Sequence, residues 1–173
     1  MEMLKFTMEK HNYLGMNFDF SVPSKVTIDM VDYINDMVDD FSVNFKKNET
    51  TTSPATENVF KVDDSNDLDK KRAKEFHTFV AKGLFVCWRA RPDIHLAIAA
   101  LTTRVKKPNE SDWKKLIHLL KYCNGTQDNK LTISIDNLHV FKWYVDSAFA
   151  VYPDFRSHTG SIMILGNGAI QSV

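Results

Sequence analysis

The spacing of apolar residues changes near residue 130, and this change constrains the fold more than any other feature of the chain. Between residues 67 and 125, apolar side chains recur every three or four positions, which is the period of a helix with one buried face. From residue 131 onward, apolar and polar side chains alternate, which is the period of a strand. The chain is therefore predicted to be an α+β protein.

The first 43 residues predict a β-hairpin followed by a helix. Apolar residues alternate with polar or small ones over residues 14–20 and again over residues 25–28, and a turn containing Pro23 separates the two runs. Asp29 can cap the helix that follows, whose apolar face ends at Phe41.

Residues 44–66 are polar, rich in Thr and Asp, and interrupted by Pro54. We expect a long loop or linker here, with a short ordered stretch around Val59 and Phe60. The chain thus divides into a hairpin and helix (1–43), a polar linker (44–66), a helical region (67–130) and a strand region (131–173).

Three helices are expected in the helical region. The first starts near Asp67, and the second restarts at Pro92, because proline suits the first position of a helix. Asn109 or Ser111 caps the third helix, and Gly125 ends it.

Four strands are expected after residue 130, over residues 131–135, 139–147, 160–165 and 169–173. Asn167-Gly168, between the last two, is a strong hairpin signal. A strand that runs to the last residue without a closing helix suggests a truncated sheet. Apolar side chains such as Phe141, Ile162 and Ile164 would then be exposed.

The charge is unevenly distributed. Residues 1–70 carry 7 Lys/Arg and 14 Asp/Glu, and residues 71–173 carry 15 and 8, so the net charge of zero combines −7 with +7. The basic half could contact phosphates. The alternative is that the two halves attract each other, or that the lysines lie on solvated helix faces, and charge counts alone favour this alternative.

Neither a membrane span nor a secretion signal is expected. No apolar run approaches the roughly 20 residues of a membrane helix, and the N-terminus lacks a basic-then-apolar pattern. We therefore expect a cytoplasmic or nuclear protein without a membrane partner. Cys87 and Cys123 lie in apolar helical patterns and are expected to be buried free thiols.

Asp146, within Tyr144-Val145-Asp146-Ser147, is the one residue that invites a catalytic interpretation. An Asp in an apolar strand is unfavourable to bury unless it is paired or binds a cation, so Asp146 is a candidate metal ligand. The alternative is an Asp at the strand end that is bonded to the backbone, and spacing alone favours it. No phosphate-binding glycine loop, His/Cys metal cluster or G-x-S-x-G motif is present.

The first three of four segments resemble parts of copia-type retrotransposon polyproteins. Tyr13-Leu14-Gly15-Met16, followed by a hairpin, resembles the end of the reverse transcriptase palm, which grips the primer end. Arg91-Pro92-Asp93-Ile94 resembles the RPDI segment of this family. Trp113 with residues 119–126 (LLKYCNGT) resembles its HW…RILRYLKGT segment.

The fourth segment resembles the start of the RNase H domain in the same family. Residues 146–150 (DSAFA), then Asp154 and residues 156–160 (RSHTG), resemble DADWAGD…RRSTSGY. Tyr144-Val145-Asp146-Ser147 is also similar to the polymerase motif YVDD, but its downstream context matches RNase H. The four segments agree with the family in order and spacing along nearly the whole chain.

Five positions depart from the family pattern. Ala90 stands where Thr usually precedes RPDI, Cys123 and Asn124 replace Leu-Lys, and Ser147 and Phe149 replace Ala-Asp and Trp. These departures suggest a divergent or decayed copy.

The resemblance implies a hairpin and helix from the reverse transcriptase, a helical connection region, and a partial RNase H-like β-sheet in residues 131–173. The parent activity would be RNA-directed DNA synthesis followed by hydrolysis of the RNA strand in the hybrid. Asp146 would be the first RNase H carboxylate and would hold Mg²⁺. The paired polymerase aspartates are expected before the chain and the next RNase H Glu after Val173, so neither active site would be complete.

The expected role is therefore weak contact with a primer–template or RNA–DNA hybrid, alongside the remainder of the polyprotein and without tightly bound Mg²⁺. The alternatives are a non-catalytic nucleic-acid-binding module and a decayed transposon remnant. Nucleic-acid contacts are assigned to five lysines: Lys106, Lys107, Lys114, Lys115 and Lys121.

Overall fold

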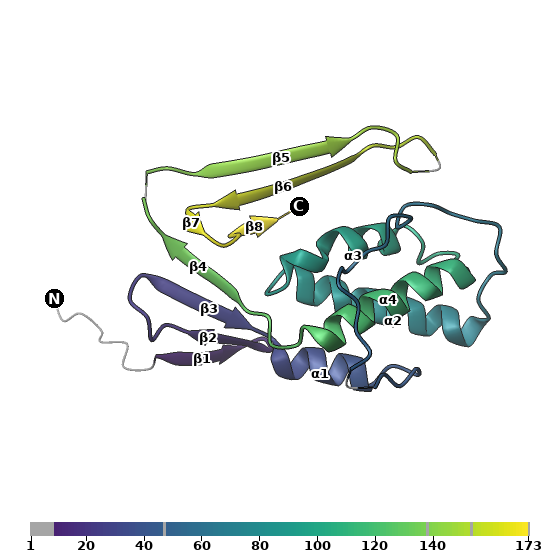
Figure 1. The fold of residues 1–173 in the computed structure, drawn as a ribbon, viewed down its shortest axis with the longest axis horizontal. Coiled ribbons are helices and arrows are strands. Elements are labelled where there is room, and N and C mark those ends of the chain that lie inside the picture. Colours follow the sequence, from purple (N-terminus) through teal and green to yellow (C-terminus); the bar gives the residue numbers. More distant parts are fainter. Residues whose placement is uncertain (1–8, 47, 138, 153, 173) are drawn as a thin grey trace.

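Four α-helices and two antiparallel sheets make up the described part of the chain in the computed structural model (Figure 1). The structure describes residues 9–46, 48–137, 139–152 and 154–172. The predicted α+β class is confirmed at this level.

The first sheet is assembled from both ends of the chain. Its strand order is β1-β2-β3-β4-β7. The bounds are β1 Lys10–Tyr13, β2 Met16–Asp19, β3 Lys25–Asp29, β4 Leu131–Ile135 and β7 Gly166–Asn167.

A tight turn at Leu14-Gly15 joins β1 to β2. Both residues have positive φ, +50° and +76°, as a two-residue hairpin turn with right-handed strand twist requires. The predicted hairpin of β2 and β3 is present, but its first strand begins at Met16 rather than Leu14. The prediction was wrong here because the alternation of residue types runs straight through a turn that Gly15 makes accessible.

Strand β4 pairs with β3 on one side and with the two-residue strand β7 on the other, and not with any of the three predicted strands of the expected C-terminal sheet. The register joins Val26 to Ile133 and Ile28 to Leu131. Directly paired residues of an antiparallel ladder point to the same face, so these four side chains form one apolar surface, which packs on the helical core. Burial of this surface accounts for the pairing across more than a hundred residues of chain.

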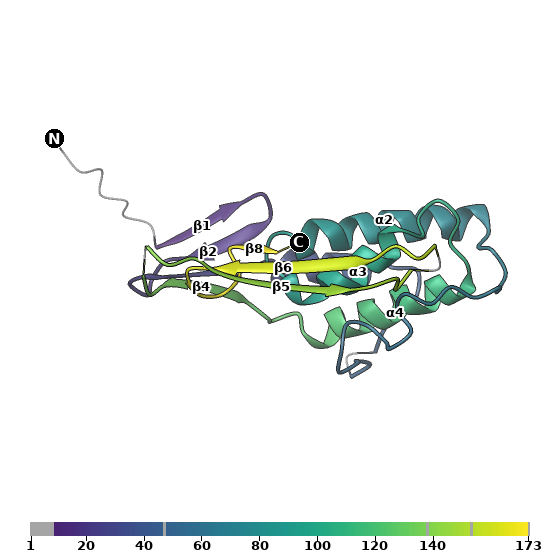
Figure 2. The ribbon, with the colours of Figure 1, turned by 90° about the horizontal axis from the view of Figure 1, so that it is seen from above.

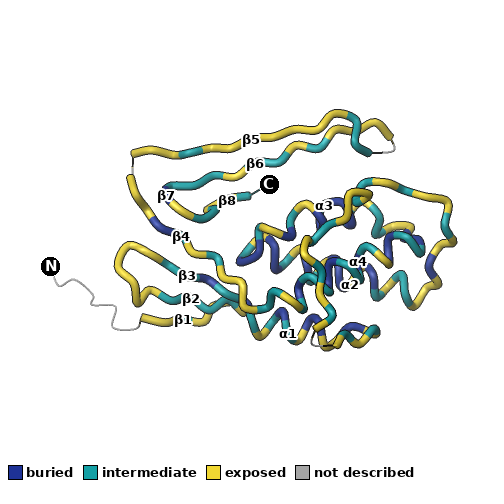
Figure 3. The backbone as a smooth tube through the Cα atoms, viewed as in Figure 1, coloured by how far each residue is buried: buried dark blue, intermediate teal, exposed yellow. Residues whose placement is uncertain are grey.

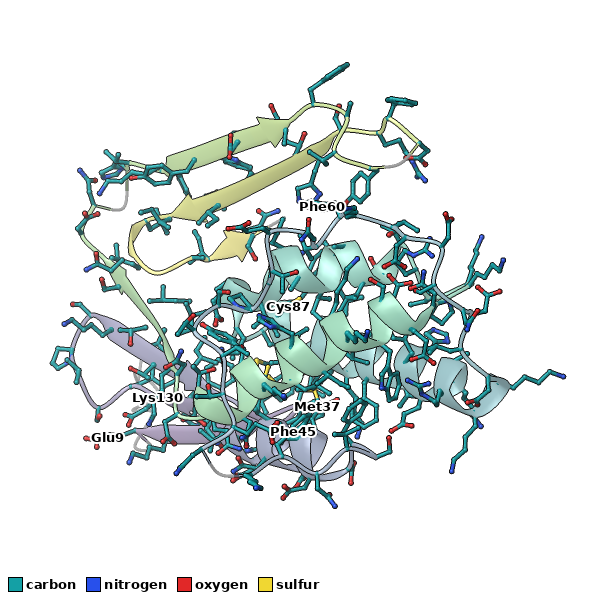
Figure 4. All side chains as sticks on the ribbon, turned by 45° about the vertical axis from the view of Figure 1, so that its right-hand side comes forward. Glu9, Met37, Phe45, Phe60, Cys87 and Lys130 are labelled. Atoms are coloured by element: carbon teal, nitrogen blue, oxygen red, sulfur yellow. The ribbon has the colours of Figure 1, made fainter. Side chains whose placement is uncertain are left out.

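The helices form the core of the molecule, covering one another and the first sheet. Their bounds are α1 Val31–Asp39, α2 Lys70–Cys87, the 3₁₀ turn η1 Pro92–Ile94, α3 His95–Thr102 and α4 Glu110–Gly125. All four α-helices contribute fully buried apolar side chains, among them Ile34, Phe76, Ile98 and Leu116. Figure 4 shows Met37 and Cys87 within this helical part.

The helix starts follow the capping chemistry of the sequence. Asn109 caps α4 in a capping box, in which its side chain accepts from the Asp112 backbone N–H and the Asp112 side chain accepts from the Asn109 N–H. Asp69 caps α2 through the backbone N–H groups of Lys71 and Arg72. Asp29 accepts from the Val31 N–H at 3.4 Å, although Met30 occupies the cap position of α1.

The second sheet has the order β5-β6-β8 and lies beside α3 (Figures 1 and 2). Its strands are β5 Lys142–Ala148, β6 His158–Ile164 and β8 Gln171–Ser172. Strands β6 and β8 pair as expected, with Ile162 opposite Ser172, but Asn167-Gly168 does not form a tight turn between them. Asn167 lies in β7, which pairs with β4, and Gly168 follows with φ +82°. The expected end of the last strand at Val173 lies outside the described residues.

The second sheet leaves apolar side chains in solvent, as expected. Ile162 on β6 is 43% exposed, and Phe141, which directly precedes β5, is 62% exposed, whereas Ile164 is half-buried. Figure 3 shows β5 exposed along most of its length, in contrast to the helices. Cys87 and Cys123 are buried free thiols, which confirms that prediction. No helix in the described ranges is long and apolar enough to cross a membrane.

Candidate functional site

Asp146 lies on β5, opposite Gly160 of β6, and is exposed. Its Oδ1 accepts the backbone N–H of Ser147 at 2.9 Å. The desolvation penalty that motivated a metal-ligand interpretation therefore does not arise, and the backbone contact agrees with the structural alternative.

The donor set around Asp146 does not fit two-metal hydrolysis. Within the described parts of the chain, no group of three or more His, Cys, Asp or Glu side chains is placed to hold a metal ion. Two metal ions in a nuclease site need several shared carboxylates, and these residues supply Asp146 alone.

A groove separates this strand from the helices. Its volume is about 470 Å³, and Asp146 lines it together with Tyr144 and Ile162 of the sheet. Pro92 and Leu96 form part of the opposite wall. The groove is thus an apolar cleft with one carboxylate on its sheet side.

Two histidines from opposite walls also line the groove, His95 of α3 and His158 of β6. Burial lowers the pKa of His95, and the nearby positive charge of His158 lowers it further. The Phe60 ring lies 5.3 Å from the His158 ring, and Nδ1 of His158 lies 3.0 Å from the Tyr152 hydroxyl. Figure 4 places Phe60 between the helices and the second sheet. No local pattern in the sequence indicates that these two histidines line one groove, because they lie in distant segments.

Three of the five predicted nucleic-acid-binding lysines contact the acidic linker or the residues that follow it. Lys121 pairs with Glu49 at 2.7 Å, and Lys107 pairs with Asp67 at 3.2 Å. Lys115 donates to the Lys61 carbonyl at 2.5 Å, and burial lowers its pKa. These three lysines are therefore less available to phosphates than their position in the sequence suggested.

The remaining two, Lys106 and Lys114, are exposed and make no ion pair within the described ranges. Lys106 follows α3, and Lys114 lies in the first turns of α4. They are the part of the predicted basic surface that stays open.

Ion pairs also join the acidic first 70 residues to the basic remainder. Among the described residues, four of them cross this division: Lys82–Asp40, Lys107–Asp67, Lys121–Glu49 and Lys130–Asp29. This pattern supports the alternative interpretation of the uneven charge, in which the two halves attract each other.

Two of the four family-like segments contact each other through Arg91. Its side chain is 1% exposed and donates from Nε and Nη2 to Asp93. It also donates to the carbonyl and hydroxyl oxygens of Thr126 at 2.9 and 2.8 Å. The Tyr122 hydroxyl donates to the same Asp93 carboxylate at 3.0 Å. The sequence alone does not indicate this role of Arg91, because its partner Thr126 lies 35 residues away, at the end of α4.

No protein-family model, no curated protein and no solved structure matches this chain.

Proposed function

We propose that this chain is a nucleic-acid-contacting part of a copia-type retrotransposon polyprotein, connecting the reverse transcriptase to an RNase H-like domain. The proposal rests on the four sequence segments, which occur in the family order. The strongest structural support is the Arg91 cluster, which consists of Arg91, Asp93, Tyr122 and Thr126. In this cluster, residues of the second and third segments form one hydrogen-bonded unit. Segments that act together in a fold are stronger support than isolated short matches.

The strand order of the second sheet supports the RNase H-like part of the proposal. Strands β5, β6 and β8 pair antiparallel in this order, with Asp146 on the first of them and β7 of the other sheet between β6 and β8 in the chain. Asp146 would be the first carboxylate of an RNase H-like site only if the remainder of the polyprotein supplied the other carboxylates that such a site needs. The role proposed for this chain is contact with the primer–template or RNA–DNA hybrid, without chemistry of its own.

The open lysines define the expected strength of that contact. Lys106 and Lys114 are the two predicted contacts that the linker does not engage. Two phosphate contacts give weak binding, with a slope of log affinity against log salt of about −2.

The test is a fluorescence anisotropy titration of a labelled RNA–DNA hybrid at two salt concentrations. The Lys106→Glu, Lys114→Glu double variant should weaken binding at low salt by roughly tenfold and flatten the salt slope. Lys25→Glu, which changes one exposed lysine on β3, is the control and should change the affinity less than threefold. Affinity that does not depend on salt, or no binding at low salt, would contradict the proposal.

A further inference from the structure

A second, smaller cavity lies where four segments of the chain meet. Its volume is about 230 Å³, and it is lined by the linker, the end of α3, helix α4 and the connection between β5 and β6. Three cationic side chains line it, Arg104, Lys115 and Arg156, and one carboxylate, Asp154. None of these four side chains lines the groove at Asp146.

A buried carboxylate beneath the cavity holds two of the cations. Arg104 donates from Nε to Oδ2 of Asp112 at 3.0 Å, and Asp112 is fully buried. The Lys115 Nζ lies 3.8 Å from Oδ1 of Asp112, and this oxygen has no hydrogen-bond partner among the described residues. The two cationic groups are thus fixed close to each other at low solvent exposure.

The electrostatics of Lys115 favour an incoming anion. Its burial lowers the pKa of the ammonium group, and the Arg104 charge acts in the same direction. Asp112 and Asp63 oppose these effects without cancelling them. An anion in the cavity would stabilise the charged form of Lys115.

The remaining wall combines an exposed cation with two aromatic rings. Arg156 is bound to Asp154 by Nε at 2.6 Å, and its side chain is 77% exposed. The Phe60 and Tyr152 rings, which also line the cavity, meet edge to face at 5.1 Å. Such rings can contact a sugar or a base beside a bound phosphate.

We propose that this cavity binds a phosphate group, carried either by a nucleotide or by a nucleic-acid strand. Guanidinium and ammonium groups form charge-assisted hydrogen bonds with phosphate oxygens, and here they converge from three separate segments. The volume suits a phosphate with the atoms next to it and is too small for a duplex. This inference goes beyond the proposed function, because it does not require a reverse transcriptase origin.

The test is isothermal titration calorimetry of the full chain with three kinds of ligand: inorganic phosphate, a nucleoside monophosphate and a DNA oligonucleotide. The oligonucleotide is used in two forms of the same sequence, one with a 5′-phosphate and one with a 5′-hydroxyl. Arg156→Gln removes a cation without uncovering Asp112 and should weaken binding roughly tenfold. Thr103→Trp keeps every charge but fills the cavity from an exposed lining position, and should abolish binding. Lys25→Gln is the matched control and should stay within twofold.

The ligands separate the two sources of phosphate. If the mononucleotide binds, and both Arg156→Gln and Thr103→Trp weaken that binding, the cavity is a nucleotide site. If the 5′-phosphorylated oligonucleotide binds more tightly than the 5′-hydroxyl form, the cavity binds the end of a strand. The Lys106→Glu, Lys114→Glu double variant should leave mononucleotide affinity within twofold, so failure of the hybrid-binding proposal would be seen separately. No saturable binding of any ligand, or binding that neither Arg156→Gln nor Thr103→Trp weakens, would overturn the inference.

Discussion

At the scale of single residues, the buried Arg91 links two segments that are far apart in the sequence. Its guanidinium connects the turn after α2 to the end of α4, through Asp93 and Thr126. The ring of Tyr122 lies 5.6 Å from the guanidinium carbon and its hydroxyl completes the cluster. A planar group with five donors can satisfy all of these partners at once, whereas an ammonium cannot.

Arg91→Lys should therefore lower the free energy of unfolding by about 2–3 kcal/mol, since the charge remains but the paired donors are lost. Urea denaturation followed by circular dichroism measures this change. Arg156→Lys is the matched control, because the Arg156–Asp154 pair is exposed, and it should change stability far less than Arg91→Lys does. Equal effects of the two variants would contradict a structural role for the Arg91 cluster.

His95 makes stability depend on pH in a defined direction. Its folded-state pKa is lowered from 6.5, first by burial and then by His158. The unfolded chain thus binds more protons below pH 6.5, so the folded state loses stability as the pH falls through that range. His95→Gln should reduce the loss of stability between pH 7 and pH 5, measured by urea denaturation at both values. His77→Gln, which changes an exposed histidine, is the control. If His95→Gln loses as much stability between pH 7 and pH 5 as the wild type, and His77→Gln loses less, the pH dependence does not arise from His95.

At the scale of elements, local chemistry was predictable and long-range pairing was not. Asn109 as the cap of α4 and the break at Pro92 were visible in the sequence, because a cap and a proline act on their immediate neighbours. The partner of β4 was not visible, since a period of two shows which side chains share a face but not which strand lies beside them. For the same reason, the sequence suggested Asp146 and the lysines of α4 as site residues. It did not indicate that His95 and His158 line one groove, or that Arg104 lines a second cavity.

The sequence allowed either Asn109 or Ser111 as the cap of α4, and the structure shows Asn109 in that position. Asn109→Ala should lower the free energy of unfolding by about 1–2 kcal/mol, because the side chain caps Asp112 and its amide also donates to the Asp63 carbonyl. Ser111→Ala should change it by less than half as much, since Ser111 lies within the helix. Thermal or urea unfolding of both variants decides the matter, and a larger effect of Ser111→Ala would contradict the assignment.

At the scale of the whole molecule, the chain consists of a well-buried part and a poorly buried part. The helices pack with the first sheet around a core that includes Ile34, Phe76 and Leu116. The second sheet contributes no side chain to that core among the described residues, and it exposes apolar groups such as Trp143 and Val145. Each large apolar side chain left in solvent forgoes roughly 1.5–3 kcal/mol of burial. The lowest local stability is therefore expected in β5, β6 and β8, of which β5 and β6 include residues of the RNase H-like resemblance.

Hydrogen exchange, followed by mass spectrometry on a sample verified as monomeric by size-exclusion chromatography, tests this central claim most directly. Amides of β5 and β6 should exchange through local opening, well before those of α4, although both sets are hydrogen-bonded in the folded state. The β3–β4 ladder serves as the internal control, because it is also a sheet but packs on the core, and it should be protected like α4. Equal protection of β5, β6 and α4 in the monomer would contradict the account, since the second sheet would then be as stable as the core.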